Sequence, residues 1–349
     1  MTNPANRFER MHVELDAEAI HAGAVDEGPA PALRTEFLKD HASSIISRNS
    51  SPDIGFAFSL NPYRGCEHGC AYCYARPYHE YLGFSAGLDF ESRIMVKEDA
   101  PTLLRSELMR KSWKPAVLAM SGVTDCYQPV ERKLEITRGC LEVLLEFRSP
   151  VGVISKNRLV ARDADVLGEL ARLGAARVTL SITTLDAELA RELEPRTSSP
   201  RDRLEAIREL TAAGVPVCVN VAPIIPGLND HEIPGILEAA ARAGAVGAGW
   251  TMLRLPGAVK DVFLDWIERH HPTKKNRILA RIRDVREGKL NESSFGQRMT
   301  GAGIFAEQVR ALFHAAARRH GLDRPLQPLR ADGFRRPGPV QMELFASQG

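Results

Sequence analysis

The chain has 349 residues, 46 Lys and Arg against 44 Asp and Glu, and a hydrophobic content of 44%. This composition excludes a fibrous or intrinsically disordered protein, and the length suits one α/β barrel with additions, since such barrels run to about 200–250 residues. No stretch approaches the roughly 18 apolar residues of a membrane span, and residues 1–8 are too polar for a signal peptide. We therefore expect a cytoplasmic protein without a membrane partner.

Residues 1–50 are rich in Ala, Gly, Pro and Glu without sustained periodicity, which predicts a mostly irregular N-terminal leader. From residue 55 onward, short apolar runs alternate with amphipathic stretches. The six strand candidates are residues 55–61, 116–121, 151–155, 177–182, 215–221 and 246–252. The helical patterns between them lie near 101–112, 130–147, 163–173, 200–213 and 231–243. Three of these patterns precede a glycine suited to a left-handed helix cap, namely Gly174, Gly214 and Gly244.

This alternation predicts an α/β fold with a parallel sheet of βαβ units over residues 51–256. Six units fit either a partial (β/α)6 TIM-like barrel or an open doubly wound sheet, and the pattern by itself does not separate the two. Both designs place chemistry at the carboxyl ends of the strands. The segments that follow the predicted strands are therefore where we look for a site.

After residue 256 the pattern becomes helical and basic, which predicts a helical C-terminal subdomain at 257–323 and a Pro-rich tail at 324–349. Residues 269–336 hold 16 Lys and Arg against 6 Asp and Glu, a formal charge of +10, whereas residues 1–268 hold 30 against 37, or −7. Two interpretations stay open: a solvated helical face that pairs with the acidic barrel, or a surface for nucleic acid. The residues that fall partly on one helical face are Lys274, Lys275, Arg277, Arg281 and Arg283.

Three of the six cysteines crowd into the loop after the first predicted strand, as Cys66, Cys70 and Cys73 in a C-x3-C-x2-C spacing. Three thiolates this close can hold one face of a cubane iron–sulfur cluster and leave its fourth iron open to a substrate. The alternative is a closed zinc site with His68 or His79 as the fourth ligand. A second cluster is not expected, because the other three cysteines are scattered singly along the chain.

The triad, with the aromatic Tyr72 directly before its third cysteine, resembles the signature of the radical S-adenosylmethionine (radical SAM) superfamily. The resemblance implies a [4Fe–4S] cluster held by Cys66, Cys70 and Cys73, whose fourth iron chelates SAM. Reductive cleavage of SAM would then give a 5′-deoxyadenosyl radical that abstracts hydrogen from a substrate. It also implies a partial (β/α)6 barrel and an electron donor such as flavodoxin or ferredoxin.

More of the chain, from about residue 51 to 321, resembles the spore photoproduct lyase-like group and a bacterial subfamily of it, from which no reaction is carried over. The stretches that carry this resemblance are residues 51–54, 61–65, 75–77, 89–91, 124–129, 194–196 and 254–256. In the lyase, the cysteine that returns a hydrogen atom lies three residues before the Asp that matches Asp125. That position is Gly122 here, so thymine-dimer repair is not expected.

The same resemblance suggests residues that contact SAM. Lys156, after the third strand, is expected to bind the SAM carboxylate, with an ordinary exposed lysine as the alternative. Ser121 and Gly122 follow the second strand, where the backbone reaches the methionine amino group, and Ser181 ends the fourth strand, where it either bonds SAM or simply ends the strand.

Arg196 is expected either to pair with Glu194 or to contact the adenosyl group. Ile225, in the loop after the fifth strand, would flank the adenine, unless that loop is only a rigid turn.

Three residues in the loop after the second strand are candidates for the chemistry itself. Asp125 and Tyr127 are expected to act as acid–base or hydrogen-atom partners, or to orient the cluster loop, and Cys126 is a candidate hydrogen donor or a core thiol. We predict a radical SAM enzyme whose substrate is not specified by the sequence, with nucleic acid among its candidates. The competing prediction is a non-catalytic zinc or iron–sulfur module that binds nucleic acid.

Overall fold

The computed structural model describes residues 3–8 and 34–338. Most of the expected leader, residues 9–33, and the end of the expected tail, residues 339–349, lie outside the described residues. Within the described ranges, every helix is too short or too polar to cross a membrane.

All six predicted strands form in the described part of the chain, as neighbours in one seven-stranded sheet of order β10-β9-β8-β7-β6-β3-β2. Its parallel members are β3 (Phe58–Leu60), β6 (Leu118–Met120), β7 (Val151–Ser155), β8 (Ala176–Ser181), β9 (Val217–Ile224) and β10 (Gly247–Met252). The edge strand β2 (Ile46–Arg48) runs antiparallel to β3. The order is open, so the sheet forms a partial (β/α)6 barrel and not a closed one.

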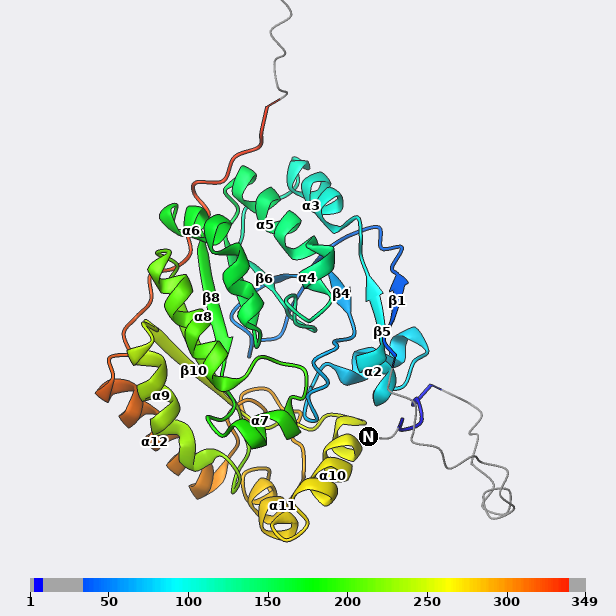
Figure 1. Ribbon diagram of the computed structural model, residues 1–349, viewed down its shortest axis with the longest axis vertical. Helices are drawn as coiled ribbons and strands as arrows, with labels where there is room; N and C mark the ends of the chain where they lie inside the picture. The colour runs from blue at the N-terminus through cyan, green and yellow to red at the C-terminus, as the bar shows by residue number, and fades with distance from the viewer. Residues whose placement is uncertain (1–2, 9–33, 339–349) are drawn as a thin grey trace, which may run out of the picture.

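Helices wrap the outside of this sheet (Figure 1). They are α3 (Ala100–Met109), α5 (Ile136–Phe147), α6 (Ala164–Arg172), α8 (Pro200–Ala212), α9 (Ile233–Arg242) and α12 (Gly303–Arg319). Their apolar stripes pack on buried strand residues such as Val153 and Val178 to form the main core. The predicted caps are confirmed, since Gly174, Gly214 and Gly244 all have positive φ, which glycine adopts without strain.

The predicted helix at 130–147 is two helices, α4 (Glu131–Leu134) and α5, separated by Glu135 in the left-handed region. The break has a physical cause, because the buried Glu131 carboxylate accepts from the backbone N–H of Thr137 at 3.1 Å and from the side chain of Arg162 at 2.9 Å. At the junction, this carboxylate takes the place of a backbone carbonyl as the acceptor for the N–H of Thr137.

A second, three-stranded sheet of order β1-β5-β4 was not predicted. Its strands are β1 (Glu36–Lys39), β4 (Tyr63–Arg64) and β5 (Arg93–Val96), and the short helix α2 (Leu88–Ser92) precedes β5. Two strands, β1 and β2, therefore lie within residues 1–50, for which the sequence predicts mostly irregular structure. The strand β4 leads directly into the cysteine loop, so this sheet anchors the loop's first end.

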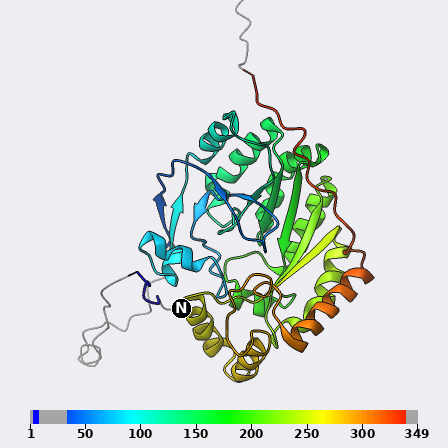
Figure 2. The same cartoon turned by 180° about the vertical axis from the view of Figure 1, so that it is seen from behind.

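The C-terminal helices α10 (Val259–His270) and α11 (Lys275–Asp284) lie at one end of the molecule, beside α7 (Ala187–Leu193) (Figure 1). Their apolar residues share a second core cluster with Cys70 and Tyr72 of the cysteine loop. In the tail, the backbone N–H of Arg330 donates to the Gly174 carbonyl and that of Arg335 to the Phe147 carbonyl, both at 2.9 Å. This part of the chain, red in Figure 2, therefore runs along the flank of the barrel.

Candidate functional site

The cysteine loop lies at the carboxyl end of the parallel strands, as the alternation of the sequence predicts. Cys66 and Cys70 are 6% and 7% exposed, Cys73 is partly buried, and all three thiols are free. Burial raises the pKa of each of the three thiols, and the neighbouring thiol of Cys73 raises the pKa of Cys66 further. The loop therefore holds three free thiols as neighbours, two of them buried and the third partly buried.

These thiols are not arranged around one metal ion. In residues 3–8 and 34–338, no group of three or more His, Cys, Asp or Glu side chains could hold such an ion. The donor set nevertheless fits an iron–sulfur cluster in number and type, since such clusters are ligated by cysteine thiolates from a short loop. A bound metal centre would also supply the positive charge that deprotonates a coordinating thiol.

Two arginines hold the backbone of the loop. Arg76 is fully buried and its Nε donates to the Cys70 carbonyl at 3.1 Å, while Arg196 donates to the Glu67 carbonyl. Both guanidiniums pair with the buried carboxylate of Glu91, Arg196 at 2.5 Å and Arg76 at 3.8 Å. Gly69 sits against this pair, where a Cβ would come within 2.0 Å of Glu91 Oε2, so a larger residue would displace the carboxylate.

The structure corrects the expected partner of Arg196. Its guanidinium binds Glu91 and not Glu194, because the chain after α7 turns it toward the cysteine loop, where its backbone N–H also donates to the His68 carbonyl at 3.3 Å. Glu194 instead pairs with Arg203 of α8. A structural ion pair is therefore present at Arg196, but with a residue 105 positions away in the chain.

Asp125 is a junction between three segments of the site. Its carboxylate accepts from Ser155 Oγ at 2.8 Å, from the backbone N–H of Lys156 at 2.7 Å and from that of Tyr127 at 2.9 Å. His68 Nδ1 lies 3.4 Å from the same carboxylate. With every oxygen engaged, Asp125 fits the orienting role better than that of an acid or base.

His68 carries this contact into the cysteine loop. Burial lowers its pKa to about 4, so the ring is neutral at physiological pH. With the proton on Nδ1, it donates to Asp125 and accepts at Nε2 from Asn157 Nδ2, 3.2 Å away. Both ring nitrogens are thus engaged, which argues against His68 as a zinc ligand.

Tyr127 and Cys126 are packed in the main core. Both side chains are completely buried, and the Tyr127 hydroxyl donates to Asp163 Oδ2 at 3.0 Å. Asp163 is itself paired with Arg138 and Arg162. Cys126 belongs to the main core, and burial raises the pKa of both groups. The geometry favours the packing roles for these two residues over direct participation in chemistry.

Lys156 and Tyr72 face each other beside the thiols. The Lys156 ammonium lies 5.9 Å from the centre of the Tyr72 ring, and its charge lowers the pKa values of Cys70 and Cys73 against the effect of burial. The Tyr72 hydroxyl bonds to Glu194 and lies 3.2 Å from Thr183 Oγ1. The structure thus brings Lys156 to the cysteine loop.

The buried ion pair of Glu194 and Arg203 supports this side of the site and was missed by sequence reasoning. Both side chains are 1% exposed or less, and Arg203 also donates to the Ser181 carbonyl at 3.0 Å. Burial raises the pKa of Glu194. The sequence held a signal for this ion pair. Arg203 falls on the core-facing side of α8, and a buried arginine needs a buried acceptor.

The remaining candidates lie at the ends of their strands. Ser121 has a φ of 84° and its hydroxyl accepts from the Cys126 backbone at 2.9 Å, which fixes the turn after β6. Gly122 follows, with its carbonyl bonded by the Tyr74 hydroxyl at 2.8 Å. Ser181 is 2% exposed at the end of β8, and Ile225 is fully buried beyond β9 in the second core cluster. Ile225 therefore supports the wall of the site from within.

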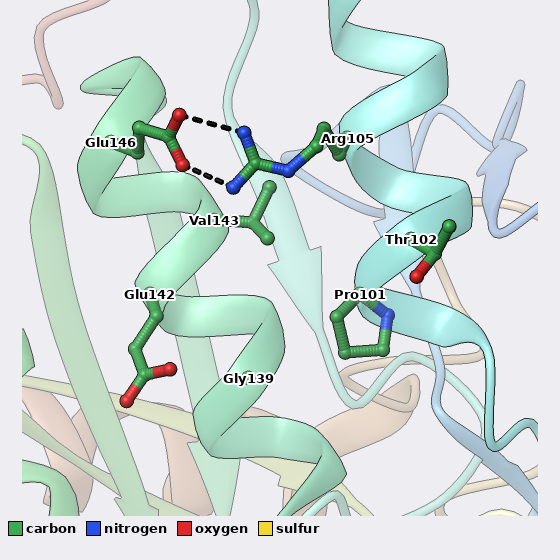
Figure 3. Close-up of a pocket in the computed structure, with 7 residues that line it drawn as sticks. All are labelled: Pro101, Thr102, Arg105, Gly139, Glu142, Val143 and Glu146. Carbon is green, nitrogen blue, oxygen red and sulfur yellow. Dashed lines mark hydrogen bonds and ion pairs between the residues drawn. The ribbon is translucent and has the colours of Figure 1, made fainter. Parts of the chain in front are cut away.

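Two surface hollows lie elsewhere. One of about 420 Å³ lies between α3 and α5, where Figure 3 shows Arg105 and Glu146 paired across it. The other, of about 450 Å³, lies between the α4 segment and α8 and is lined in part by Asn157, Arg158 and Asp202. Neither is lined by a cysteine of the loop, so neither is a candidate for the cluster site.

Comparison with known proteins agrees with this architecture. The sequence profile of the radical SAM superfamily matches residues 60–240. An uncharacterized protein of Mycobacterium tuberculosis is 34% identical over 348 residues, which cover 94% of this chain and 98% of the relative. A radical SAM Nα-GlyT isomerase of Pseudomonas phage M6 is 27% identical over 244 residues, covering 69% of this chain and 48% of that protein.

Among solved structures, spore photoproduct lyase complexed with dinucleoside spore photoproduct aligns with a TM-score of 0.57. The alignment covers 81% of this chain and 79% of the lyase at 16% identity, so it shows a shared fold. The fold and the cysteine loop define a protein of the partial-barrel class, whose cysteine loop lies at the carboxyl ends of the parallel strands. The chain belongs to the radical SAM superfamily.

Proposed function

We propose that this radical SAM enzyme holds a [4Fe–4S] cluster on Cys66, Cys70 and Cys73 and binds SAM beside it, between the cysteine loop and Lys156. The observation that carries the proposal is the set of three free thiols next to an ammonium at the carboxyl ends of the strands. When bound, the cluster would supply the electron for reductive cleavage of SAM to methionine and a 5′-deoxyadenosyl radical.

The protein's own residues prepare this site in three ways. Arg76 and Arg196 fix the carbonyls of the loop, Asp125 and His68 join the loop to the end of β7, and Lys156 provides a positive charge for a carboxylate. The apolar second core, which includes Ile225 and Tyr72, excludes water from one side. Exclusion of water protects a reactive radical from side reactions.

A direct test is anaerobic reconstitution with iron and sulfide, followed by SAM and a reductant. We expect a brown protein that forms 5′-deoxyadenosine. A colourless protein that retains zinc and forms no 5′-deoxyadenosine would contradict the proposal and favour the non-catalytic module. An acidic electron carrier such as flavodoxin or ferredoxin is proposed as the physiological reductant.

Lys156→Ala should weaken SAM binding about ten- to a hundredfold, because it removes a charge-assisted contact of about 1.5–3 kcal/mol. The measurement is titration of the reduced cluster with SAM, followed by electron paramagnetic resonance.

The matched control is Lys133→Ala, which removes an exposed lysine at the end of α4 and should leave the dissociation constant unchanged. Iron content should be normal in both variants. An unchanged dissociation constant in Lys156→Ala would remove this lysine from the SAM site.

The enzyme is not expected to repair spore photoproduct. Gly122 stands where the lyase has its hydrogen-donating cysteine, and Cys126 is buried in the core. Incubation with dinucleoside spore photoproduct, SAM and reductant should give 5′-deoxyadenosine without thymine monomers. Stoichiometric formation of thymine monomers would show that another residue donates the hydrogen.

Nucleic acid is a candidate substrate or partner, through residues 269–336. On α11 and just before it, Lys274, Arg277 and Arg283 are exposed and have no carboxylate partner within the described residues. Other basic side chains are committed to the fold, as in Arg336, which donates to the carbonyls of Leu108 and Arg110. The surface charge available for phosphates is therefore smaller than +10.

The logarithm of any DNA or RNA affinity should fall with the logarithm of salt concentration, by about 0.7–0.9 per neutralised phosphate. Filter binding between about 50 and 200 mM salt measures this slope. A charge-neutralised Lys274→Gln, Arg277→Gln, Arg283→Gln variant should show a smaller slope. Absence of binding at low salt would leave only the solvated-face interpretation.

A further inference from the structure

Two arginines at the carboxyl end of β10 lack a counter-ion. Arg254 lies two residues beyond the end of the strand, and Arg286 approaches from the segment after α11. Within the described residues, neither guanidinium has a carboxylate within ion-pair distance, and the Nε atom of each is buried without a hydrogen-bond partner. Buried charge without a partner is costly, which makes two such groups side by side a notable feature.

The contacts that these arginines do make hold them in place without neutralising them. Arg286 is 1% exposed and donates to the carbonyls of Leu253 and of Gln297, the latter at 3.0 Å. Arg254 is partly exposed, and its Nη1 contacts the sulfur of Met299 at 3.6 Å. Burial lowers the pKa of both groups, that of Arg286 to about 10, and each is lowered further by a neighbouring guanidinium.

A third arginine beside them is already neutralised. Arg298 pairs with Asp53 at 2.5 Å and also donates to Ser51, so it forms one side of this group of arginines. Asp53 does not form an ion pair with Arg254, because its carboxylate lies beyond ion-pair distance of the Arg254 guanidinium. Asp53 attracts Arg254 and Glu292 attracts Arg286 from beyond ion-pair distance, so within the described residues neither arginine has a carboxylate in direct contact.

This group of arginines lies beside the cysteine loop. The Arg254 guanidinium lies 5.6 Å from the centre of the Tyr74 ring, and Tyr74 directly follows Cys73. The Tyr74 side chain is 45% exposed, and the nearby Phe295, which lies against Arg298, is 61% exposed. A ligand held by Arg254 would thus be next to the segment that carries the third thiol.

We propose that Arg254, supported from behind by Arg286, binds an oxyanion of the substrate, a phosphate or a carboxylate, at the open edge of the barrel beside Tyr74. Guanidinium groups suit this role because their planar donors match both anions in a bidentate geometry. The proposal rests on the proposed function in one respect, since it assigns the anion to the substrate of that reaction. It makes Arg254 a binding residue and Arg286 a positioning residue.

The test titrates the full-length, reconstituted protein with inorganic phosphate and, separately, with acetate, against potassium chloride at equal ionic strength. The readout is the midpoint of thermal unfolding, which rises when a ligand binds the native state. We expect a saturable rise for the wild type and at least a tenfold higher half-saturating concentration for Arg254→Gln. Saturation by phosphate alone would identify a phosphate ester, and saturation by acetate would identify a carboxylate.

Two further variants control this result. Arg254→Lys keeps the charge but loses the planar donors, so it should weaken anion binding less than Arg254→Gln does. If Arg254→Gln does not fold, Arg254→Lys takes its place in the titration and should still bind more weakly than the wild type. Arg172→Gln removes an exposed arginine of α6, outside residues 269–336, and should titrate as the wild type does.

The proposal fails if the wild type shows no saturable rise with either anion, or if Arg254→Gln titrates as the wild type does. It also fails if saturating SAM abolishes the rise, since the anion site would then be part of the SAM site. None of these measurements requires SAM cleavage. A failure of the radical chemistry and a failure of anion binding are therefore distinguishable.

Discussion

Replacing any one of Cys66, Cys70 and Cys73 with alanine is expected to abolish cluster binding and SAM cleavage together. The loss of one thiolate leaves a second iron without a protein ligand, and the described structure offers no nearby cysteine to replace it, since the other three lie in the main core or in β9. The measurements are iron and sulfide content after anaerobic reconstitution, and the yield of 5′-deoxyadenosine.

Cys218→Ala is the matched control, because Cys218 is also a buried free cysteine, 7% exposed, but lies within β9. It should retain the iron content of the wild type. If a variant of the loop retained full iron content and activity, the assignment of that cysteine as a ligand would be refuted.

Glu91→Ala is expected to destabilise the protein by about 3–5 kcal/mol, the usual cost of removing one partner from a buried ion pair. The substitution leaves the fully buried Arg76 without a carboxylate partner and removes the partner of Arg196. Both arginines donate to carbonyls of the cysteine loop. We therefore also expect faster loss of iron from the reconstituted protein. Urea unfolding under anaerobic conditions measures the first effect, and the rate of iron release to a chelator measures the second.

Glu36→Ala is the control for this prediction. Glu36 pairs with Arg93 at 3.8 Å on the surface, where both side chains are about half exposed, so its removal should cost less than about 1 kcal/mol. Equal destabilisation by the two substitutions would show that the pairing of Glu91 with the arginines adds nothing to stability. Unchanged iron release in Glu91→Ala would show that the loop does not depend on these contacts.

The site residues separate into those that local sequence could identify and those that it could not. The three cysteines follow directly from the spacing of the loop, and Lys156 follows from its place after a strand together with the family resemblance. Glu91 was not singled out, since its partner Arg196 is 105 positions away in the chain. The pair of Arg203 with Glu194, nine residues apart, was overlooked although a buried arginine on α8 needs a buried acceptor. Asp125, Tyr127 and Cys126 were found as a group, but only the packing shows that Asp125 orients the loop while the other two face the core.

The sequence by itself determined the six βα units, their order and the position of the cysteine loop, because hydrophobic periodicity and helix-capping glycines act within a few residues. Periodicity did not separate an open sheet from a partial barrel, but the family resemblance predicted the partial barrel and the structure confirms it. Only the tertiary structure decided that a second sheet of β1, β4 and β5 anchors the loop, and that Arg254 and Arg286 meet without a carboxylate in ion-pair contact. The physical reason is that strand pairing and the neutralisation of buried charge depend on segments far apart in the chain. Packing brings these segments together, and local periodicity does not report which of them meet.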